Sequence, residues 1–200
     1  IEYRPVHRSR YAFRVVTSRG AVRRMSRAGI TRLLNRLQRR GGYMLQALIP
    51  LVTYHGRRCD LRVPVQRDGT GEWQVVQPVA KRAVRHEYLT NMARGGHAFH
   101  LDVLLKEVFP GSRAADIEEN LRHLALAVAR RLSEVHAHLA DIGLDVGLDR
   151  DGRPWLIEVN FRDQRLVAKR AGLRDIHAVQ YHQPIAYAHH LLTKGLNVTQ

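Results

Sequence analysis

The most constraining feature of the sequence is a strand, turn, strand pattern in its C-terminal half. Residues 144–160 read LDVGLDRDGRPWLIEVN, in which two apolar, strand-like segments flank a DRDG turn. The pattern predicts an antiparallel hairpin that folds back about Gly152. Asp145 stands near the start of the first strand, and Glu158 and Asn160 near the end of the second. The fold of this segment therefore brings these three side chains together at the open end of the hairpin.

This trio is a candidate metal site. Glu158 and Asn160 are two residues apart, so they point to the same face of their strand. Two carboxylates and an amide oxygen form the hard, all-oxygen ligand set that suits Mg²⁺, which typically bridges substrate phosphates. The alternative is a polar hairpin whose acidic groups simply face solvent.

The other segments show which fold class surrounds the hairpin. We predict a helix over 26–38, a second hairpin over 59–85 with its turn at 68–72, and a polar binding loop over 86–98. A long helix is expected from Ser112 or Asp116 through Leu139, with Gly143 ending it.

Weaker signals complete the chain. Residues 1–20 favour two short strands around a basic HRSR turn, residues 43–51 favour a strand leading into a linker between two lobes, and residues 168–197 are weakly helical. Adjacent strands mostly connect through tight turns, so the order of elements predicts an α+β protein with antiparallel sheets.

Composition limits the possible partners and settings. The 33 Lys and Arg residues against 18 Asp and Glu residues give a formal charge of +15, which favours anionic partners. The one cysteine, Cys59, excludes an intrachain disulfide and a four-cysteine zinc site, so a reducing, cytoplasmic setting is the default. No apolar run approaches the roughly 18 residues of a membrane span, so no membrane partner is expected. The start at Ile1, without Met, suggests a fragment with a domain upstream.

Several arginines cluster on the predicted helix over 26–38. Arg27, Arg32, Arg36 and Arg39 lie away from its apolar positions. They form either a solvated helix surface or an anion-binding surface.

The 144–160 segment resembles the metal-binding hairpin of ATP-grasp enzymes, in which an Asp precedes a Gly-containing turn and an E-x-N triplet. Asp145 and Glu158 are 13 positions apart, as in D-alanine:D-alanine ligase and its relatives. The resemblance implies metal ligation by Asp145, Glu158 and Asn160, with ATP and Mg²⁺ as cofactors.

The resemblance continues along the chain. YMLQALIPL is similar to the family's hinge, which implies adenine contacts from Gln46, Ala47, Leu48 and Ile49. CDLRV and the run from AKR to TNMARGG resemble the D-x-R strand and phosphate loop of the ribosomal-protein glutamate ligases. That likeness points to Arg62, Arg82 and Asn91 as catalytic residues.

Within ATP-grasp proteins, the motifs are most similar to those of the endospore-coat-associated YheC/YheD group. This implies two α+β lobes with antiparallel sheets that grip ATP, without the N-terminal pre-ATP-grasp domain. Residues 1–48 would be part of the smaller lobe, and residues 49–200 the larger lobe with the 144–160 hairpin. A spore location and spore-coat partners would follow from the same likeness.

One segment departs from the family pattern. ATP-grasp proteins usually have a Lys-Pro before a glycine-rich phosphate loop, whereas this chain has Arg4-Pro5 followed by VHRSRYAFR. Arg4 could neutralise phosphate as a forked guanidinium group, but the glycines that let backbone N–H groups approach phosphate are missing.

The resemblance implies a carboxylate–amine ligase in which ATP activates an unknown acid for attack by an unknown amine, with Arg62 and Arg82 stabilising the transferred phosphoryl group.

The altered loop motivates a first alternative, a catalytically degenerate ATP-grasp protein with a structural or assembly role. The charge of +15 motivates a second, a basic nucleic-acid-binding module. Against the second, no helix-turn-helix, zinc-finger or RNA-recognition pattern appears, so nucleic acid is the less favoured partner.

Overall fold

The computed structural model describes residues 2–3, 13–16, 22–42, 49–84, 96–111, 113–161 and 165–197. The chain divides into two compact units, Ile1–Leu48 and Ile49–Gln200. Gln46, Ala47 and Leu48, the predicted adenine contacts of the first unit, lie outside the described residues, as do Arg4 and Asn91.

The first unit has a three-stranded antiparallel sheet followed by one helix. The strands, in the order β1-β2-β3, are β1 (Glu2–Tyr3), β2 (Phe13–Val16) and β3 (Val22–Met25), and the helix is α1 (Arg27–Arg40). Ser26 caps α1, because its hydroxyl oxygen accepts a hydrogen bond from Gly29 N at 3.2 Å. Ile30 is buried. The helix predicted over 26–38 is confirmed.

The second unit contains a seven-stranded sheet. Its strands are β4 (Thr53–Tyr54), β5 (Arg57–Arg67), β6 (Trp73–Val75), β7 (Val79–Arg82), β8 (His97–His100), β9 (Asp141–Leu148) and β10 (Pro154–Asn160). The main order is β10-β9-β5-β7-β8, with β4 and β6 also paired to β5. Every pairing is antiparallel, which confirms the α+β class.

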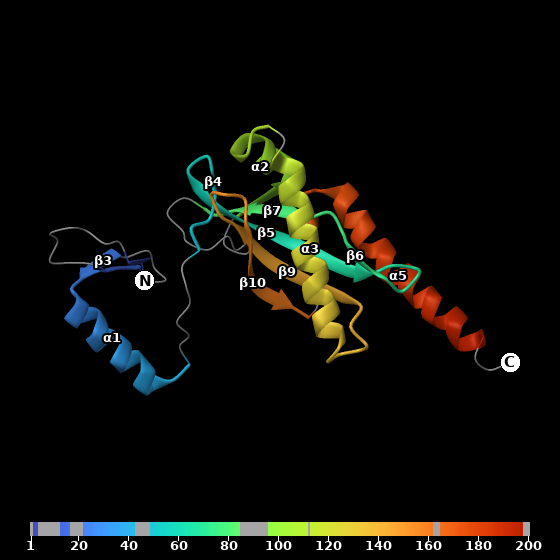
Figure 1. The fold of residues 1–200 in the computed structure, drawn as a ribbon, viewed down its shortest axis with the longest axis horizontal. Coiled ribbons are helices and arrows are strands. Elements are labelled where there is room, and N and C mark those ends of the chain that lie inside the picture. Colours follow the sequence, from blue (N-terminus) through green and yellow to red (C-terminus); the bar gives the residue numbers. More distant parts are fainter. Residues whose placement is uncertain are drawn as a thin grey trace. The chain divides into compact units, whose positions relative to one another are not determined.

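Helices cover the two faces of this sheet differently. Leu61, Val63 and Val65 of β5 are fully buried in the core. The helices α2 (Leu101–Val108) and α3 (Arg113–Ser133) pack on that face, and Figure 1 shows α3 lying across the sheet.

The opposite face is covered at one end by C-terminal helices, α4 (Leu166–Arg170) and α5 (Arg174–Asn197). The buried Gln66 side chain of β5 points to this face, where its Nε2 donates to Gln180 O of α5 at 3.0 Å and to Asp141 Oδ1 at 3.1 Å. Arg165 forms an ion pair with the same Asp141 carboxylate. Burial raises the pKa of Asp141, and the hydrogen bond from Gln66 and the charge of Arg165 oppose that rise.

Three local expectations are corrected. The strand-like segment 73–82 is two strands, because the chain leaves the sheet between β6 and β7. Of the binding loop predicted over 86–98, residues 86–95 lie outside the described residues, and residues 97 and 98 belong to β8. The long helix ends at Ser133 rather than running through Leu139, and Gly143 lies in β9. Residues 141–143 pair with 64–66 of β5, so long-range sheet pairing overrides the helical periodicity there.

Two further observations concern the helices. The segment of α2 carried no prediction, and α5 is longer than α3, at 24 residues against 21. Among the described residues, no helix combines the length and the apolar character that crossing a bilayer requires.

Candidate functional site

A row of charged side chains crosses four neighbouring strands on the sheet face opposite α3. The register pairs Asp60 with Lys81, Arg62 with Asp145, and Asp145 with Glu158. Residues directly opposite each other in an antiparallel pair point to the same face. We call this surface the charged sheet face, and it comprises Asp60, Arg62, Lys81, Asp145, Glu158 and Asn160.

Asp145 lies at the centre of the charged sheet face. Its Oδ1 atom is 3.0 Å from Lys81 Nζ and 3.2 Å from Arg62 Nε. Lys81 Nζ is also 3.2 Å from Asp60 Oδ1, and the Lys81 side chain is only 7% exposed. Charges this shielded are stable only when they are paired, so Lys81 and the two aspartates hold one another in place.

A β-bulge orients the second strand of the hairpin. Leu156 pairs with Val146, but Glu158 pairs with Asp145, because the register shifts between them. In an unbroken register Glu158 would face Leu144 and the core. The one extra residue, Ile157, turns Glu158 to the face that carries Asp145.

Asn160 links the hairpin to β5. In the amide orientation that suits both neighbours, its oxygen accepts from Arg62 Nη1 at 2.9 Å and its nitrogen donates to Glu158 Oε1 at 3.0 Å. Arg62 therefore contacts Asp145 and Asn160 together, and the three sequence-predicted metal ligands share one surface with it.

The turn of this hairpin is fixed by Asp149. Its carboxylate accepts from the backbone N–H groups of Asp151 and Arg153, each at 3.0 Å, and from Trp155 Nε1 at 2.8 Å. Burial would raise the pKa of Asp149, but the hydrogen bonds from Trp155 and the backbone hold it below its usual value. A rigid turn keeps β9 and β10 in the register that the charged sheet face needs.

Arg82 does not join Arg62. It pairs with Cys59 on the core-facing side of the sheet, and its guanidinium lies 5.6 Å from the centre of the Tyr54 ring. Lys81, one residue earlier, occupies the face on which a phosphate-binding pair of Arg62 and Arg82 was expected. Ile49 is half-buried at the start of the second unit, where its carbonyl accepts from Leu51 N at 2.8 Å.

Sequence reasoning missed Asp60 and Lys81. Asp60 stands two residues before Arg62 in CDLRVPV, and Lys81 directly precedes Arg82 in PVAKR, so the signal available was their place beside the two predicted arginines. Which of two adjacent basic residues faces Arg62 depends on the register between β5 and β7, and no local pattern determines that register.

The donor set fits magnesium only together with a phosphate ligand. The side chains of Asp145, Glu158 and Asn160 supply carboxylate and amide oxygens, which Mg²⁺ prefers. Among the described residues, no group of three or more His, Cys, Asp or Glu side chains is placed to hold a metal ion. Asp145 is also paired with two cationic groups. Mg²⁺ commonly takes one or two carboxylates and completes its shell with water and phosphate oxygens, and this surface matches that pattern.

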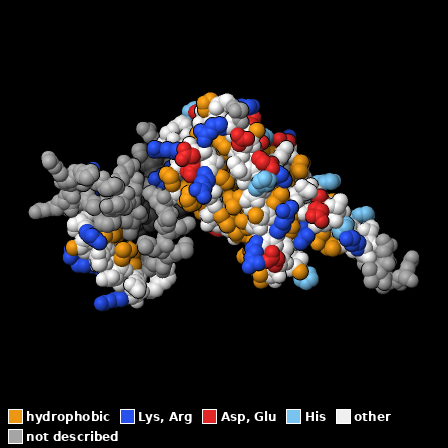
Figure 2. Space-filling view, in the orientation of Figure 1, with side chains coloured by type: hydrophobic (Ala, Val, Ile, Leu, Met, Phe, Trp, Pro, Cys, Tyr) orange, Lys and Arg blue, Asp and Glu red, His pale blue; other side chains and the backbone are white. Residues whose placement is uncertain are grey.

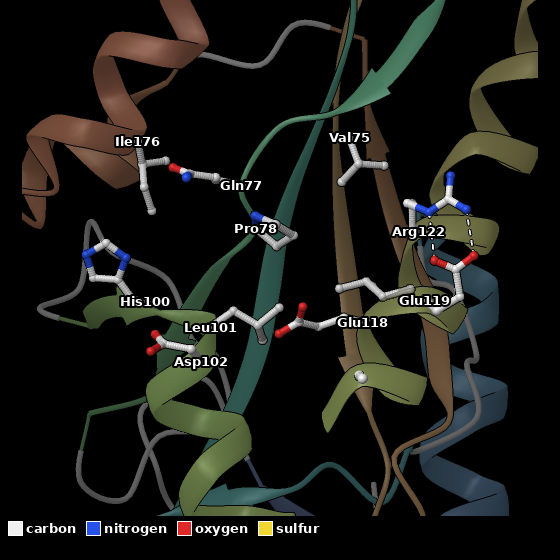
Figure 3. Close-up of a pocket in the computed structure, with 12 residues that line it drawn as sticks. Val75, Gln77, Pro78, His100, Leu101, Asp102, Glu118, Glu119, Arg122 and Ile176 are labelled. Carbon is white, nitrogen blue, oxygen red and sulfur yellow. Dashed lines mark hydrogen bonds and ion pairs between the residues drawn. The ribbon is translucent and has the colours of Figure 1, made fainter. Parts of the chain in front are cut away.

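A separate pocket of about 540 Å³ lies between the β6–β7 connection, α2, α3 and α5. Figure 3 shows Glu118 near Leu101, with Asp102 and the Glu119–Arg122 ion pair to either side and Ile176 also lining the pocket. None of the sequence-predicted site residues lines this pocket.

Comparison with known proteins gives a consistent result. A family model described as YheC/D like ATP-grasp matches residues 7–191. The chain is 26% identical over 123 residues to the endospore coat-associated protein YheC of Bacillus subtilis (strain 168), covering 62% of this chain and 34% of that protein. It is 24% identical over 157 residues to the endospore coat-associated protein YheD of the same organism, covering 77% of this chain and 34% of that protein. The chain thus spans about a third of the length of these relatives.

Proposed function

The chain belongs to the YheC/D-like ATP-grasp family, and from this we propose that it binds Mg·ATP at the charged sheet face and serves a carboxylate–amine ligase reaction. The carrying observation is the convergence of Asp145, Glu158 and Asn160 with Arg62 and Lys81 on one surface. Carboxylate and amide oxygens for a metal thus lie beside cationic groups for phosphate.

The acidic and amide side chains of this surface have a different proposed role from the basic ones. Asp145, Glu158 and Asn160 would hold the metal, and the Arg62 guanidinium would bind phosphate oxygens through its forked donors. Lys81 would keep the Asp145 carboxylate oriented through the 3.0 Å contact. Bound Mg·ATP would supply the phosphoryl group that activates a substrate carboxylate for attack by an amine. Positioning and charge neutralisation would then account for most of the rate enhancement.

Location and partners belong to the same proposal. YheC and YheD of Bacillus subtilis are described as endospore coat-associated. We propose that this chain works in the cytoplasm and associates with spore-coat proteins.

Calorimetric titration with Mg·ATP tests the nucleotide site. We expect saturable binding that requires Mg²⁺ and is lost in an Asp145→Ala/Glu158→Ala variant. The matched control is Asp116→Ala/Glu118→Ala, which removes two exposed acidic groups of α3 and should bind as the unaltered chain does. Loss of binding in both variants, or in neither, would contradict the site.

A turnover assay with panels of carboxylates and amines separates the two ATP-grasp alternatives. Phosphate release that depends on an added acid and amine supports the ligase. Tight Mg·ATP binding without release under any pairing supports a binding-only, assembly role.

A further inference from the structure

The positive charge of this protein is concentrated in its first unit. Residues 1–48 contain twelve arginines, no lysine and one acidic residue, Glu2, which gives this unit a formal charge of +11. The other 152 residues carry 21 basic and 17 acidic groups, a charge of only +4. The excess charge is therefore a property of one small unit.

Four of these arginines form one face of α1. Arg32, Arg36, Arg39 and Arg40 stand at positions i, i+4, i+7 and i+8, so they fall on one side of the helix, and all four are exposed. We call this surface the arginine face of α1. In Figure 2, the described part of the first unit shows Lys or Arg side chains and no acidic ones.

This arrangement destabilises the helix that carries it. The pairs Arg32–Arg36 and Arg36–Arg40 are like charges at i, i+4 spacing, which destabilise a helix. Within the part of the chain that the structure describes, no ion pair joins these four arginines to a carboxylate. The proposed nucleotide site uses none of them. A polyanion from outside the chain would supply the missing counter-charge.

From this surface we propose that the arginine face of α1 binds the phosphate backbone of nucleic acid, without base preference. Forked guanidinium donors match phosphate oxygens. From Arg32 to Arg40 the helix rises about 12 Å, which matches three to four base-pair steps of about 3.4 Å. Because α1 contains no aromatic residue, base stacking is not available to it. The function is additional to the proposed ligase activity.

A membrane surface fits these observations less well. Membrane-bound amphipathic helices bury their apolar side among lipids. In α1 that side is already used within its own unit, where Ile30 is 4% exposed and Leu33, Leu34 and Leu37 are half-buried.

Fluorescence anisotropy of the full chain with a labelled 20-base-pair DNA tests the proposal. If all four arginines contact phosphate, log K should fall with log salt at a slope of about −3.6, so binding weakens about 150-fold between 50 and 200 mM salt. Duplexes of unrelated sequence should bind alike.

Three variants assign the effect. Replacing Arg32, Arg36, Arg39 and Arg40 by Gln keeps helix propensity, and should weaken binding at 50 mM salt at least tenfold and reduce the magnitude of the slope by about 3.6. The same positions changed to Lys should keep most of the slope. The matched control replaces four exposed arginines of the second unit by Gln, namely Arg130, Arg150, Arg170 and Arg174. Its DNA affinity and its salt slope should change little. Circular dichroism verifies that each variant is folded.

Specific results would overturn the proposal. These are equal losses in the Gln variant and the control, equally tight binding of polyglutamate or anionic lipid vesicles at the same salt, or displacement of DNA by Mg·ATP beyond the effect of ionic strength alone.

Discussion

The ammonium group of Lys81 lies between the carboxylates of Asp60 and Asp145 and is almost entirely shielded from solvent. Replacing it by Met leaves two acidic groups close together without their shared cation. Breaking a buried ion pair from one side typically costs about 3–5 kcal/mol. We expect Lys81→Met to lower the free energy of unfolding by about that amount, measured by urea denaturation, and to weaken Mg·ATP binding.

The control for this change is Lys106→Met on α2. Lys106 also pairs with a carboxylate, Asp102 at 2.9 Å, but its side chain is 77% exposed. Exposed pairs contribute at most about 1 kcal/mol, so this variant should stay close to the unaltered chain. Similar losses for the two lysines would show that Lys81 has no special position.

Cys59 gives a second prediction at the residue scale. Its side chain is fully buried, and burial raises the pKa of its thiol to about 12. The thiolate is the reactive form, so at pH 8 the native protein should resist alkylation by iodoacetamide while the urea-unfolded chain reacts fully. Mass spectrometry measures both. Rapid labelling of the native protein would contradict the buried position of this thiol in β5.

Among the elements, the turn between β5 and β6 depends on one carboxylate. Asp68 accepts hydrogen bonds from Thr70 Oγ1 at 2.6 Å, Thr70 N at 2.8 Å, Glu72 N at 3.1 Å and Gln74 Nε2 at 3.1 Å. The hydrogen bond from the Thr70 side chain is the largest of the causes that lower the pKa of Asp68 from 3.8 to about 2.

The pH dependence of stability follows from that direction. Because the folded pKa lies below the unfolded one, ionised Asp68 stabilises the fold above about pH 4, and this contribution is lost as the pH falls through 2. Asp68→Asn keeps an oxygen acceptor but cannot ionise. We expect the difference in unfolding free energy between the two proteins to be constant from pH 7 to about 4 and to shrink below it. A difference that is the same at pH 2.5 and pH 7 would contradict this.

The turn of the site hairpin tests backbone conformation. Gly152 has a φ of +78°, and a Cβ atom there would lie 2.6 Å from Ile117 Cδ1 of α3. Gly172 has a φ of +72°, but a Cβ atom there would meet nothing within 4 Å. Gly172→Ala should therefore lower the free energy of unfolding only by the strain of the left-handed conformation, about 1–2 kcal/mol. Gly152→Ala should lower it distinctly more, because the new methyl group also meets Ile117. Denaturation midpoints compare the two, and equal losses would rule out the contact with α3.

Local signals predicted the elements that depend on local physics. The hairpin of β9 and β10 follows from strand alternation around DRDG, and α1 follows from Ser26, the leucine spacing and the glycines at 41 and 42. Strand geometry made Asp145, Glu158 and Asn160 a candidate metal site, and the family likeness favoured that reading over a solvent-facing polar hairpin. Those roles, like the remaining site assignments, stay predictions.

The features that the sequence analysis missed depend on contacts between distant segments. The end of α3 at Ser133 is set by the pairing of β9 with β5, and the choice of Lys81 over Arg82 by the pairing of β7 with β5. The bulge at Ile157 has no motif of its own, yet without it Glu158 would face the core. These features follow from the register between paired strands, and no single segment of the sequence determines that register.

At the scale of the whole molecule, the two units differ in how much core they have. Of the described residues, Ile30 is the buried apolar side chain of the first unit, whereas the second contains one large buried cluster and a small one. We expect residues 49–200 alone to fold, with a cooperative denaturation and a near-ultraviolet circular dichroism spectrum. Residues 1–48 alone should not, because chains this short rarely bury enough apolar surface. A non-cooperative transition for 49–200 would show that its core needs the first unit.

The pairing of β5 with β9 also sets when the site can form. Arg62 and Asp145 are neighbours across these strands although 83 positions separate them along the chain. Such a contact closes a long loop, so it forms slowly compared with helices and local hairpins. During synthesis, the ribosome must release β9 before Asp145 can meet Arg62 and Lys81, whereas Asp60 and Lys81 lie on strands that emerge earlier. Until then, Lys81 has only Asp60 as its partner, Arg62 lacks its contact with Asp145, and the proposed nucleotide site is incomplete.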